Sequence, residues 1–231
     1  MNTKQINHHF NLFAKFVFRM KITIAKIISY IFHPVFIPTY TFSFILFTNN
    51  YFSFFFSNTI KLLLLAVTFF FTALLPILNL FILRRFRLIS SFFLKDARER
   101  TFPYFITSLF YIGLIYLIKD FRLPGIYVSF LIASAICITA AAFINLKWKI
   151  SAHLIGIGGL AGSVLAISYI LHQNMLIWFC ILILISGITA YSRIVLNEHT
   201  HPQTIAGFLL GSIGMFFLLI IAYFINLHTI L

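Results

Sequence analysis

Charge, and negative charge above all, is scarce in this sequence of 231 residues. Only 9% of the residues are Asp, Glu, Lys or Arg, whereas 61% are hydrophobic. A water-soluble domain carries about 25% charged residues, so this chain has too few to cover a soluble fold. The composition excludes soluble globular, disordered and coiled-coil proteins, and it predicts an integral membrane protein.

The sequence has only four acidic residues, which are Asp96, Glu99, Asp120 and Glu198. Sites that hold divalent metal ions take their ligands from clusters of carboxylates, and here only Asp96 and Glu99 are close in sequence. We therefore expect no metal and no other cofactor. The two cysteines, Cys137 and Cys180, lie inside apolar runs, which indicates packing residues rather than a disulfide framework.

Positive charge is plentiful by contrast, since 17 Lys and Arg residues give a net charge of +13. This excess indicates an anionic partner, and for a membrane protein the first candidate is a lipid headgroup. We expect no nucleic-acid partner, because the charge does not lie on a soluble face. The expected partners are the bilayer and a lipid phosphate, and the oligomeric state stays open.

Residues 1–35 mix apolar with basic residues, and no uncharged stretch before residue 27 is long enough to span a bilayer. The segment also lacks a small-residue cleavage site, which argues against a removable signal peptide. It is predicted to form an amphipathic helix that lies in the headgroup region. Pro34 and Pro38 are expected to break the chain after it.

Residues 36–231 are predicted to form one membrane-embedded, all-α domain, a bundle of six to seven transmembrane helices. Each apolar stretch is near the roughly 20 residues that cross the hydrocarbon core. The predicted spans are 36–57, 61–83, 102–118, 125–146, 153–171, 176–196 and 204–227. The loops after the second, fourth and sixth spans must share one face, since two crossings return the chain to the same side. These loops carry nearly all polar residues of interest, which indicates a single site.

The first polar segment runs from Lys95 to Pro103 and contains Arg98 and Arg100. Three cations directly before a span can bind a phosphate by charge and by forked hydrogen bonds. The alternative is a topology signal of the kind that the positive-inside rule describes.

In the second polar segment, Ser151 is placed to open a helix whose free N–H groups can bind an anion. His153 would then lie in the first turn, where it can transfer a proton. The alternative is an ordinary serine N-cap followed by an interfacial histidine.

In the third polar segment, Arg193 stands at the end of a span, where an unpaired guanidinium is costly. A bound anion or a carboxylate partner is therefore expected beside it. His199 and Gln203 are four residues apart, so they share one face if the turn between them is helical.

Together the three segments resemble the signature segments of the type 2 phosphatidic acid phosphatase family, which shares its core with vanadium haloperoxidases. The family pattern is Lys-x6-Arg-Pro, then Pro-Ser-Gly-His, then Ser-Arg-x5-His-x3-Asp. The resemblance covers about residues 95–211. The matching positions are Lys95, Pro103, Ser151, His153, Ser192, Arg193 and His199.

The resemblance implies a metal-independent phosphatase or phosphotransferase that acts on a lipid phosphate or diphosphate. His199 would attack phosphorus and form a phosphohistidine, and His153 would protonate the leaving oxygen. Fixed cations and dipoles can stabilise the spreading charge of a transferred phosphoryl group without a metal. The implied phosphate-binding residues are Lys95, Ser151 and Arg193, with Arg98 or Arg100 as the further cation of the first segment.

The chain departs from the family pattern at Phe102, where Arg is expected, and at Gln203, where an Asp orients the nucleophilic histidine. A Gln carbonyl can accept the imidazole N–H and fix its tautomer, but it does not offset the charge of an imidazolium. Both departures favour the alternative function, a catalytically inactive relative that binds or moves an anionic lipid.

The expected location is the inner membrane of a bacterium. Most basic residues fall on the face shared by the N-terminal segment and the three polar loops, which the positive-inside rule assigns to the cytoplasm. The family resemblance favours the outer face instead.

Overall fold

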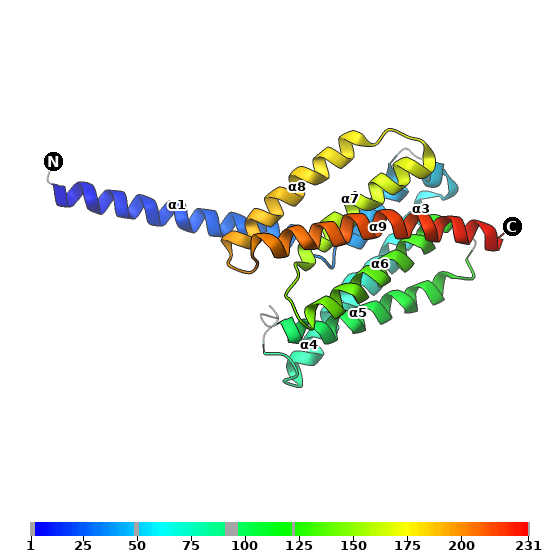
Figure 1. Cartoon of the computed structure of the whole chain (residues 1–231), viewed down its shortest axis with the longest axis horizontal. Coiled ribbons are helices and arrows are strands. Elements are labelled where there is room, and N and C mark those ends of the chain that lie inside the picture. The colour runs from blue at the N-terminus through cyan, green and yellow to red at the C-terminus, as the bar shows by residue number, and fades with distance from the viewer. Residues whose placement is uncertain (1–2, 49–50, 91–96, 122, 231) are drawn as a thin grey trace.

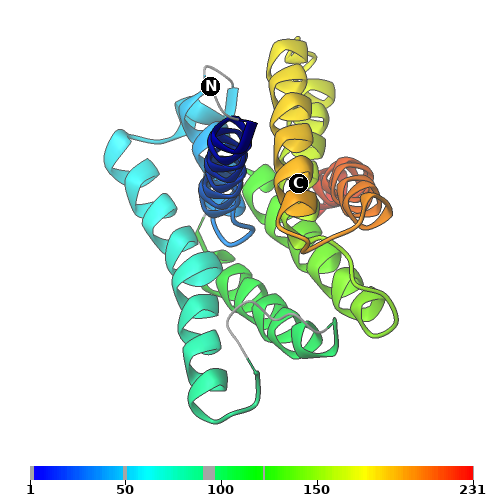
Figure 2. The same ribbon diagram turned by 90° about the vertical axis from the view of Figure 1, so that its left-hand side faces the viewer.

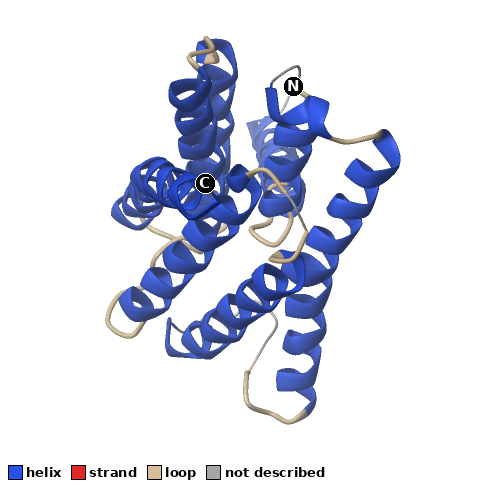
Figure 3. Ribbon diagram, turned by 90° about the vertical axis from the view of Figure 1, so that its right-hand side faces the viewer, coloured by secondary structure: helices blue, strands red, loops and turns tan. Residues whose placement is uncertain are grey.

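The chain is a bundle of helices, described by a computed structural model over residues 3–48, 51–90, 97–121 and 123–230. Side chains are described over 15–48, 51–90, 99–121 and 123–225. Every regular element in these ranges is a helix (Figure 3), which confirms the predicted all-α class. The elements are α1 (Thr3–Ile31), α2 (Ile37–Phe47), the 3-10 helix η1 (Tyr51–Phe55), α3 (Asn58–Phe69), the π-helix η2 (Phe70–Leu74), α4 (Leu75–Arg85), α5 (Ala97–Ile118), α6 (Gly125–Asn145), α7 (Ala152–Leu171), α8 (Leu176–Val195) and α9 (His201–Ile230).

Six helical stretches in the described part of the chain are long and apolar enough to cross a membrane. Each matches one of the last six predicted spans, and α3, η2 and α4 together form the first of them. The stretches are Asn58–Arg85, Glu99–Ile118, Gly125–Asn145, Ala152–Leu171, Leu176–Val195 and His201–Ile225. The chain is thus a membrane protein, as its composition predicts.

The predicted first span, residues 36–57, is wrong as a single helix. Its helix α2 has only 11 residues, which cover about 16 Å, or roughly half of the hydrocarbon core. Pro38 lies in the first turn, where a proline starts a helix but does not extend one backwards. At the other end the backbone of Thr48 is extended, and a separate 3-10 turn follows.

The segment that contains α2 and η1 nevertheless connects the two ends of the bundle. At its start, the His33 ring lies 5.2 Å from the ring of His153, in the first turn of α7. Further on, the Phe44 ring lies 5.5 Å from Trp178, at the opposite end of the bundle, where α8 begins. The chain therefore still changes sides before α3.

The loops that follow α4, α6 and α8 meet at one end of the bundle, as the parity of the spans predicts. Lys149, between α6 and α7, lies 3.9 Å from Glu198, between α8 and α9. Arg100, in the first turns of α5, lies 3.3 Å from His199. This end, called the polar end below, holds the candidate site.

Helix α1 extends away from the bundle as one long helix at the polar end (Figures 1 and 2). Its last turns pack against the protein, since Ala25 and Ser29 are buried. Lys21 adds a cation–π contact, with Nζ 5.2 Å from the Tyr191 ring centre on α8. The predicted N-terminal helix thus exists, and its position in the headgroup region stays a prediction.

Helices α7 and α9 lie in backbone contact because glycines face each other across their interface. A Cβ added to Gly211 would lie 2.1 Å from the backbone oxygen of Ile155, and one added to Gly162 would lie 2.2 Å from that of Ser212. Small residues let membrane helices pack this closely. The contact also joins the second and third polar segments, since the Ser151 N–H donates to the Gln203 carbonyl at 3.3 Å.

We expect Gly211→Ala to destabilise the protein, because the new methyl would meet backbone atoms that cannot turn aside. Overpacking of this kind costs about 1–3 kcal/mol or more. Gly187→Ala on α8 is the matched control, because nothing lies within 4 Å of its added Cβ. Thermal unfolding in detergent should give a lower midpoint for Gly211→Ala alone. Equal midpoints for both variants would contradict the packing described.

Candidate functional site

His199 is the centre of a chain of hydrogen bonds at the polar end. It is 6% exposed, and its Nδ1 lies 3.0 Å from Oε1 of Gln203. The same Oε1 accepts the backbone N–H of Thr200 at 3.2 Å, which identifies that atom as the amide oxygen. Nδ1 of His199 must therefore donate, so that the neutral ring carries its proton there and keeps a lone pair on Nε2.

That lone pair is directed at Arg100. Nη1 of Arg100 lies 3.3 Å from Nε2 of His199, and the guanidinium, which has no acceptor, donates to it. Burial first, and then the charge of Arg100, lower the pKa of His199 to about 3. His199 is thus a neutral base at physiological pH, which is the protonation state that a nucleophilic imidazole requires.

The end of α8 brings His199 to this position. Asn197 adopts a left-handed backbone conformation, with φ of 54°, which Asn tolerates better than most residues. The N–H groups of Glu198 and His199 both donate to the carbonyl of Arg193, at 3.0 and 3.3 Å. The chain thereby folds back over the last turn of α8, and Pro202 in the first turn of α9 starts the next helix.

Arg193, beside His199, uses only part of the hydrogen-bonding capacity of its guanidinium. Its Nη2 lies 3.8 Å from Oε2 of Glu198, which is also 3.9 Å from Nζ of Lys149. These are long ion pairs, with one carboxylate shared by two cations. The Nε of Arg193 is buried without a hydrogen-bond partner in the described chain. The carboxylate partner that the sequence predicts is therefore present, yet it leaves part of the guanidinium free.

Ser151 does not act as the ordinary N-cap that the sequence allowed. It occupies the N-cap position of α7, but its side chain makes no capping hydrogen bond. Its residue is fully buried, and within the described part of the chain Oγ has no partner. Orphaned buried donors are costly in a native protein and indicate a missing ligand or water. Ser151 and Arg193 together thus offer unused donors to an anion.

His153 lies in the first turn of α7 and is mostly buried. Its Nε2 is 3.2 Å from the backbone oxygen of Ser29. A carbonyl only accepts, so Nε2 carries the proton in the neutral ring and Nδ1 keeps the lone pair. The atom of His153 that can exchange a proton with a ligand is therefore Nδ1.

The end of α1 and the bend after it contribute residues that the sequence analysis missed. The His33 ring packs edge-on against His153, and Ser29 fixes the tautomer of that histidine. Burial first, and then the charge of Arg193, lower the pKa of His33 to about 4. The signal in the sequence is a histidine directly before Pro34, at the break between two helices.

Tyr104 was also missed. It lies one helical turn after Arg100 on α5, and the two side chains hydrogen bond. The spacing of four residues puts both on one face of the helix, which is the signal that could have identified it.

The predicted residues are brought together with few exceptions. His199, Gln203, Arg100, Arg193, Ser151 and His153 all lie at the polar end, as described above. Phe102 is 55% exposed and faces away from them, so it does not replace the arginine of the family pattern. Lys95 lies outside the described residues, as does the side chain of Arg98. Of the two candidate arginines, Arg100 is the one seen to contact His199.

No group of three or more His, Cys, Asp and Glu side chains is placed to hold a metal ion in the part of the chain searched, the described residues. The described groups that do converge are cations, neutral imidazoles and unused donors around the carboxylate of Glu198. This arrangement can bind an anion with several oxygens, present a nucleophilic nitrogen to it, and supply a proton from a second imidazole.

A scan of the chain against protein-family models found no match, and comparisons with curated proteins and with solved structures found none either.

We predict that acid destabilises the protein through its buried histidines. The pKa of His199 is about 3 and that of His33 about 4, below the ordinary 6.5. Between pH 6.5 and these values the unfolded chain binds protons that the folded chain does not. The free energy of unfolding therefore decreases as the pH is lowered through this range. For each imidazole that stays neutral in the folded protein, the free energy of unfolding at pH 5 is lower by about 2 kcal/mol than at neutral pH.

Thermal unfolding at pH 7.5 and pH 5 tests this expectation. His199→Gln should reduce the loss of stability at pH 5, whereas His201→Gln, at an exposed position two residues away, should not. An equal acid loss in wild type and His199→Gln would refute the assignment of a buried neutral imidazole.

Proposed function

We propose that this protein is a metal-independent membrane phosphatase or phosphotransferase, which acts on a lipid phosphate or diphosphate through a phosphohistidine. One observation carries the proposal: His199 is a buried neutral imidazole whose Nε2 lone pair meets the Arg100 guanidinium, while Gln203 holds its Nδ1–H. A phosphate bound to Arg100 would bring its phosphorus to that lone pair.

Two unused donors and the guanidinium of Arg100 would bind the phosphate. Its oxygens would accept hydrogen bonds from Arg100, from the orphaned Nε of Arg193 and from the orphaned Oγ of Ser151. Charge-assisted bonds of this kind are the strong ones in proteins. Arg100 would then turn from Nε2 of His199 to a phosphate oxygen, which frees the nucleophile.

The reaction has two steps. Nε2 of His199 bonds to phosphorus as the bond from phosphorus to the lipid oxygen breaks. That oxygen takes a proton from Nδ1 of His153, whose ring is neutral without a ligand and would take up this proton when the anionic phosphate binds beside it. Water then attacks the phosphohistidine and gives a proton to Nδ1 of His153. Inorganic phosphate leaves and His199 regains its lone pair. An alcohol in place of water gives phosphotransfer instead.

A second candidate function is the binding or movement of an anionic lipid without chemistry. Gln203 favours it, because the amide accepts from both His199 and Thr200 but carries no charge to stabilise an imidazolium. The anion site is the same in both cases, so the two functions differ in whether phosphate is released. We propose the inner membrane of a bacterium as the location, with the basic polar end towards the cytoplasm.

The test is phosphate release from mixed lipid phosphates by the purified protein in EDTA. We expect release that survives the chelator and that falls by about 10³-fold or more in His199→Gln, since the nucleophile is gone. His201→Gln is the matched control and should keep full activity. Release that needs added metal, or that is equal in both variants, would exclude the mechanism.

Restoring a carboxylate beside the nucleophile should raise the rate. We expect Gln203→Glu to increase kcat about tenfold or more, within the roughly 10⁴-fold that the reverse change costs a serine-protease triad. Gln173→Glu, exposed between α7 and α8 at the opposite end, controls for added charge. A fall in kcat for Gln203→Glu, with the control unchanged, would mean that Gln203 does not orient a nucleophile.

A further inference from the structure

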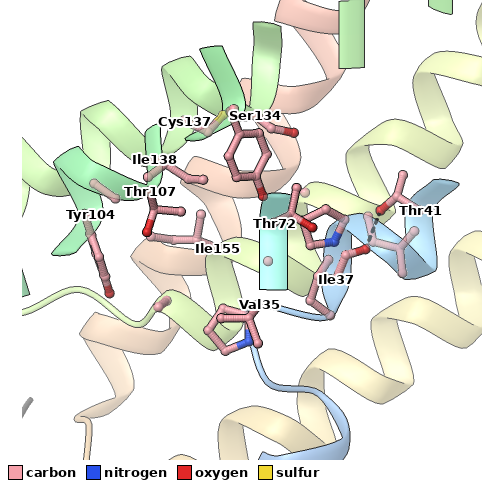
Figure 4. A pocket seen from close by; sticks show the side chains of 18 of the residues that line it. Val35, Ile37, Thr41, Thr72, Tyr104, Thr107, Ser134, Cys137, Ile138 and Ile155 are labelled. Atoms are coloured by element: carbon pink, nitrogen blue, oxygen red, sulfur yellow. Dashed lines mark hydrogen bonds between the residues drawn. The ribbon is translucent and has the colours of Figure 1, made fainter. Parts of the chain in front are cut away.

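An apolar cavity of about 150 Å³ lies between α2, η2, α5, α6 and α7, within the part of the protein that spans the membrane (Figure 4). It is distinct from the polar site, because none of the charged residues described above lines it. No local pattern in the sequence predicts it.

The cavity begins where the polar site ends. Pro34, directly after His33, lines it, and so does Ala152, which stands between Ser151 and His153. Tyr104 is shared, because it lines the cavity and hydrogen bonds to Arg100. In Figure 4 its ring forms one edge of the cavity, and its hydroxyl points away from the Ser134 and Cys137 end. A molecule with its anionic group at the polar site would therefore have its next atoms at the cavity mouth.

Three of the hydroxyl groups that line the cavity are already hydrogen bonded within their own helices. Thr41, Thr72 and Thr107 each donate to the carbonyl four residues earlier in their own helix, at 3.0, 2.8 and 2.8 Å. Because these threonine donors are used and most of the other lining side chains are apolar, the cavity holds water poorly and favours an apolar occupant.

The cavity has a limited depth. On α5 it extends from Tyr104 to Tyr111, and on α6 from Ala141 to Phe130. These separations correspond to about 10 to 16 Å along the helices, which is at most about half of the hydrocarbon core. Tyr111 and Phe130 are each 3% exposed, so the far end is surrounded by protein.

We propose that this cavity binds one hydrocarbon chain of the ligand whose phosphate occupies the polar site, and that its far end limits the length of that chain. The proposal builds on the proposed function in taking a phosphate as the headgroup, but it requires no catalysis. It names the ligand class as a phosphate ester with at least one extended, unbranched or isoprenoid chain that leaves the bilayer and enters the protein.

A photoreactive alkyl phosphate with a diazirine at the chain end tests the position of the chain directly. With the protein in phosphatidylcholine nanodiscs, we expect cross-links at Tyr111 and Phe130, mapped by mass spectrometry. The alcohol that lacks the phosphate should label them less. Cross-links confined to Leu109, Ile112 and Ile136, which are exposed on the outer faces of α5 and α6, would overturn the proposal.

A filled cavity tests the length limit. Unlabelled n-alkyl phosphates, used below their micelle concentrations, should compete with the labelled ligand. Their affinity should increase about fourfold for each added methylene and reach a plateau at the chain length that fills the cavity. Ser134→Leu should move this plateau to shorter chains and leave the shortest ones unaffected. Ile136→Phe adds bulk to the outer face of α6 and is the matched control. An unchanged plateau in Ser134→Leu would contradict the length limit.

The failures of the two proposals are distinguishable. Labelling inside the cavity without phosphate release from any lipid would support the chain-binding cavity and refute the proposed phosphatase activity. Phosphate release that depends on His199, with labelling only on the outer faces of α5 and α6, would support the phosphatase activity and refute the chain-binding cavity.

Discussion

The backbone contact between α7 and α9 is the constraint on which the site depends. Glycines at positions 158, 162 and 211 bring the two helices so close that a single added methyl would meet a backbone oxygen. The same contact sets the start of α7 beside the start of α9, where the Ser151 N–H bonds to the Gln203 carbonyl. His153 and His199 thereby lie at the same end of the bundle, although they are 46 positions apart in the sequence.

Charge and burial then decide what that space can hold. Arg100 and Arg193 are brought into a low-dielectric region with Glu198 as the carboxylate at the site. Their charges, with desolvation, keep His199 and His33 neutral. An anion would reverse this balance, because it pairs with the arginines and accepts from the orphaned groups. The adjoining apolar cavity lies in the membrane-spanning part of the protein. One ligand would therefore contact cations at its anionic end and apolar side chains at its other end.

Much of this was predictable because hydrophobicity and parity are properties of the sequence itself. The last six spans and the shared face of the three polar loops followed from run lengths alone. Residues 36–57 misled, since an apolar run of span length does not reveal that its helix ends at Phe47 after only 11 residues. The contact of Arg100 with His199 and the roles of His33 and Ser29 depended on tertiary contacts that no local pattern encodes.

The central claim is that Nε2 of His199 bonds to phosphorus, and the direct measurement is the intermediate itself. The protein would be mixed with a lipid phosphate, quenched in base within a turnover, digested and analysed by mass spectrometry. The account predicts a phosphoryl group on the peptide that contains His199, which is labile in acid and missing in His199→Gln. A protein that releases phosphate yet never carries a phosphoryl group on His199, or carries it elsewhere, would contradict the account.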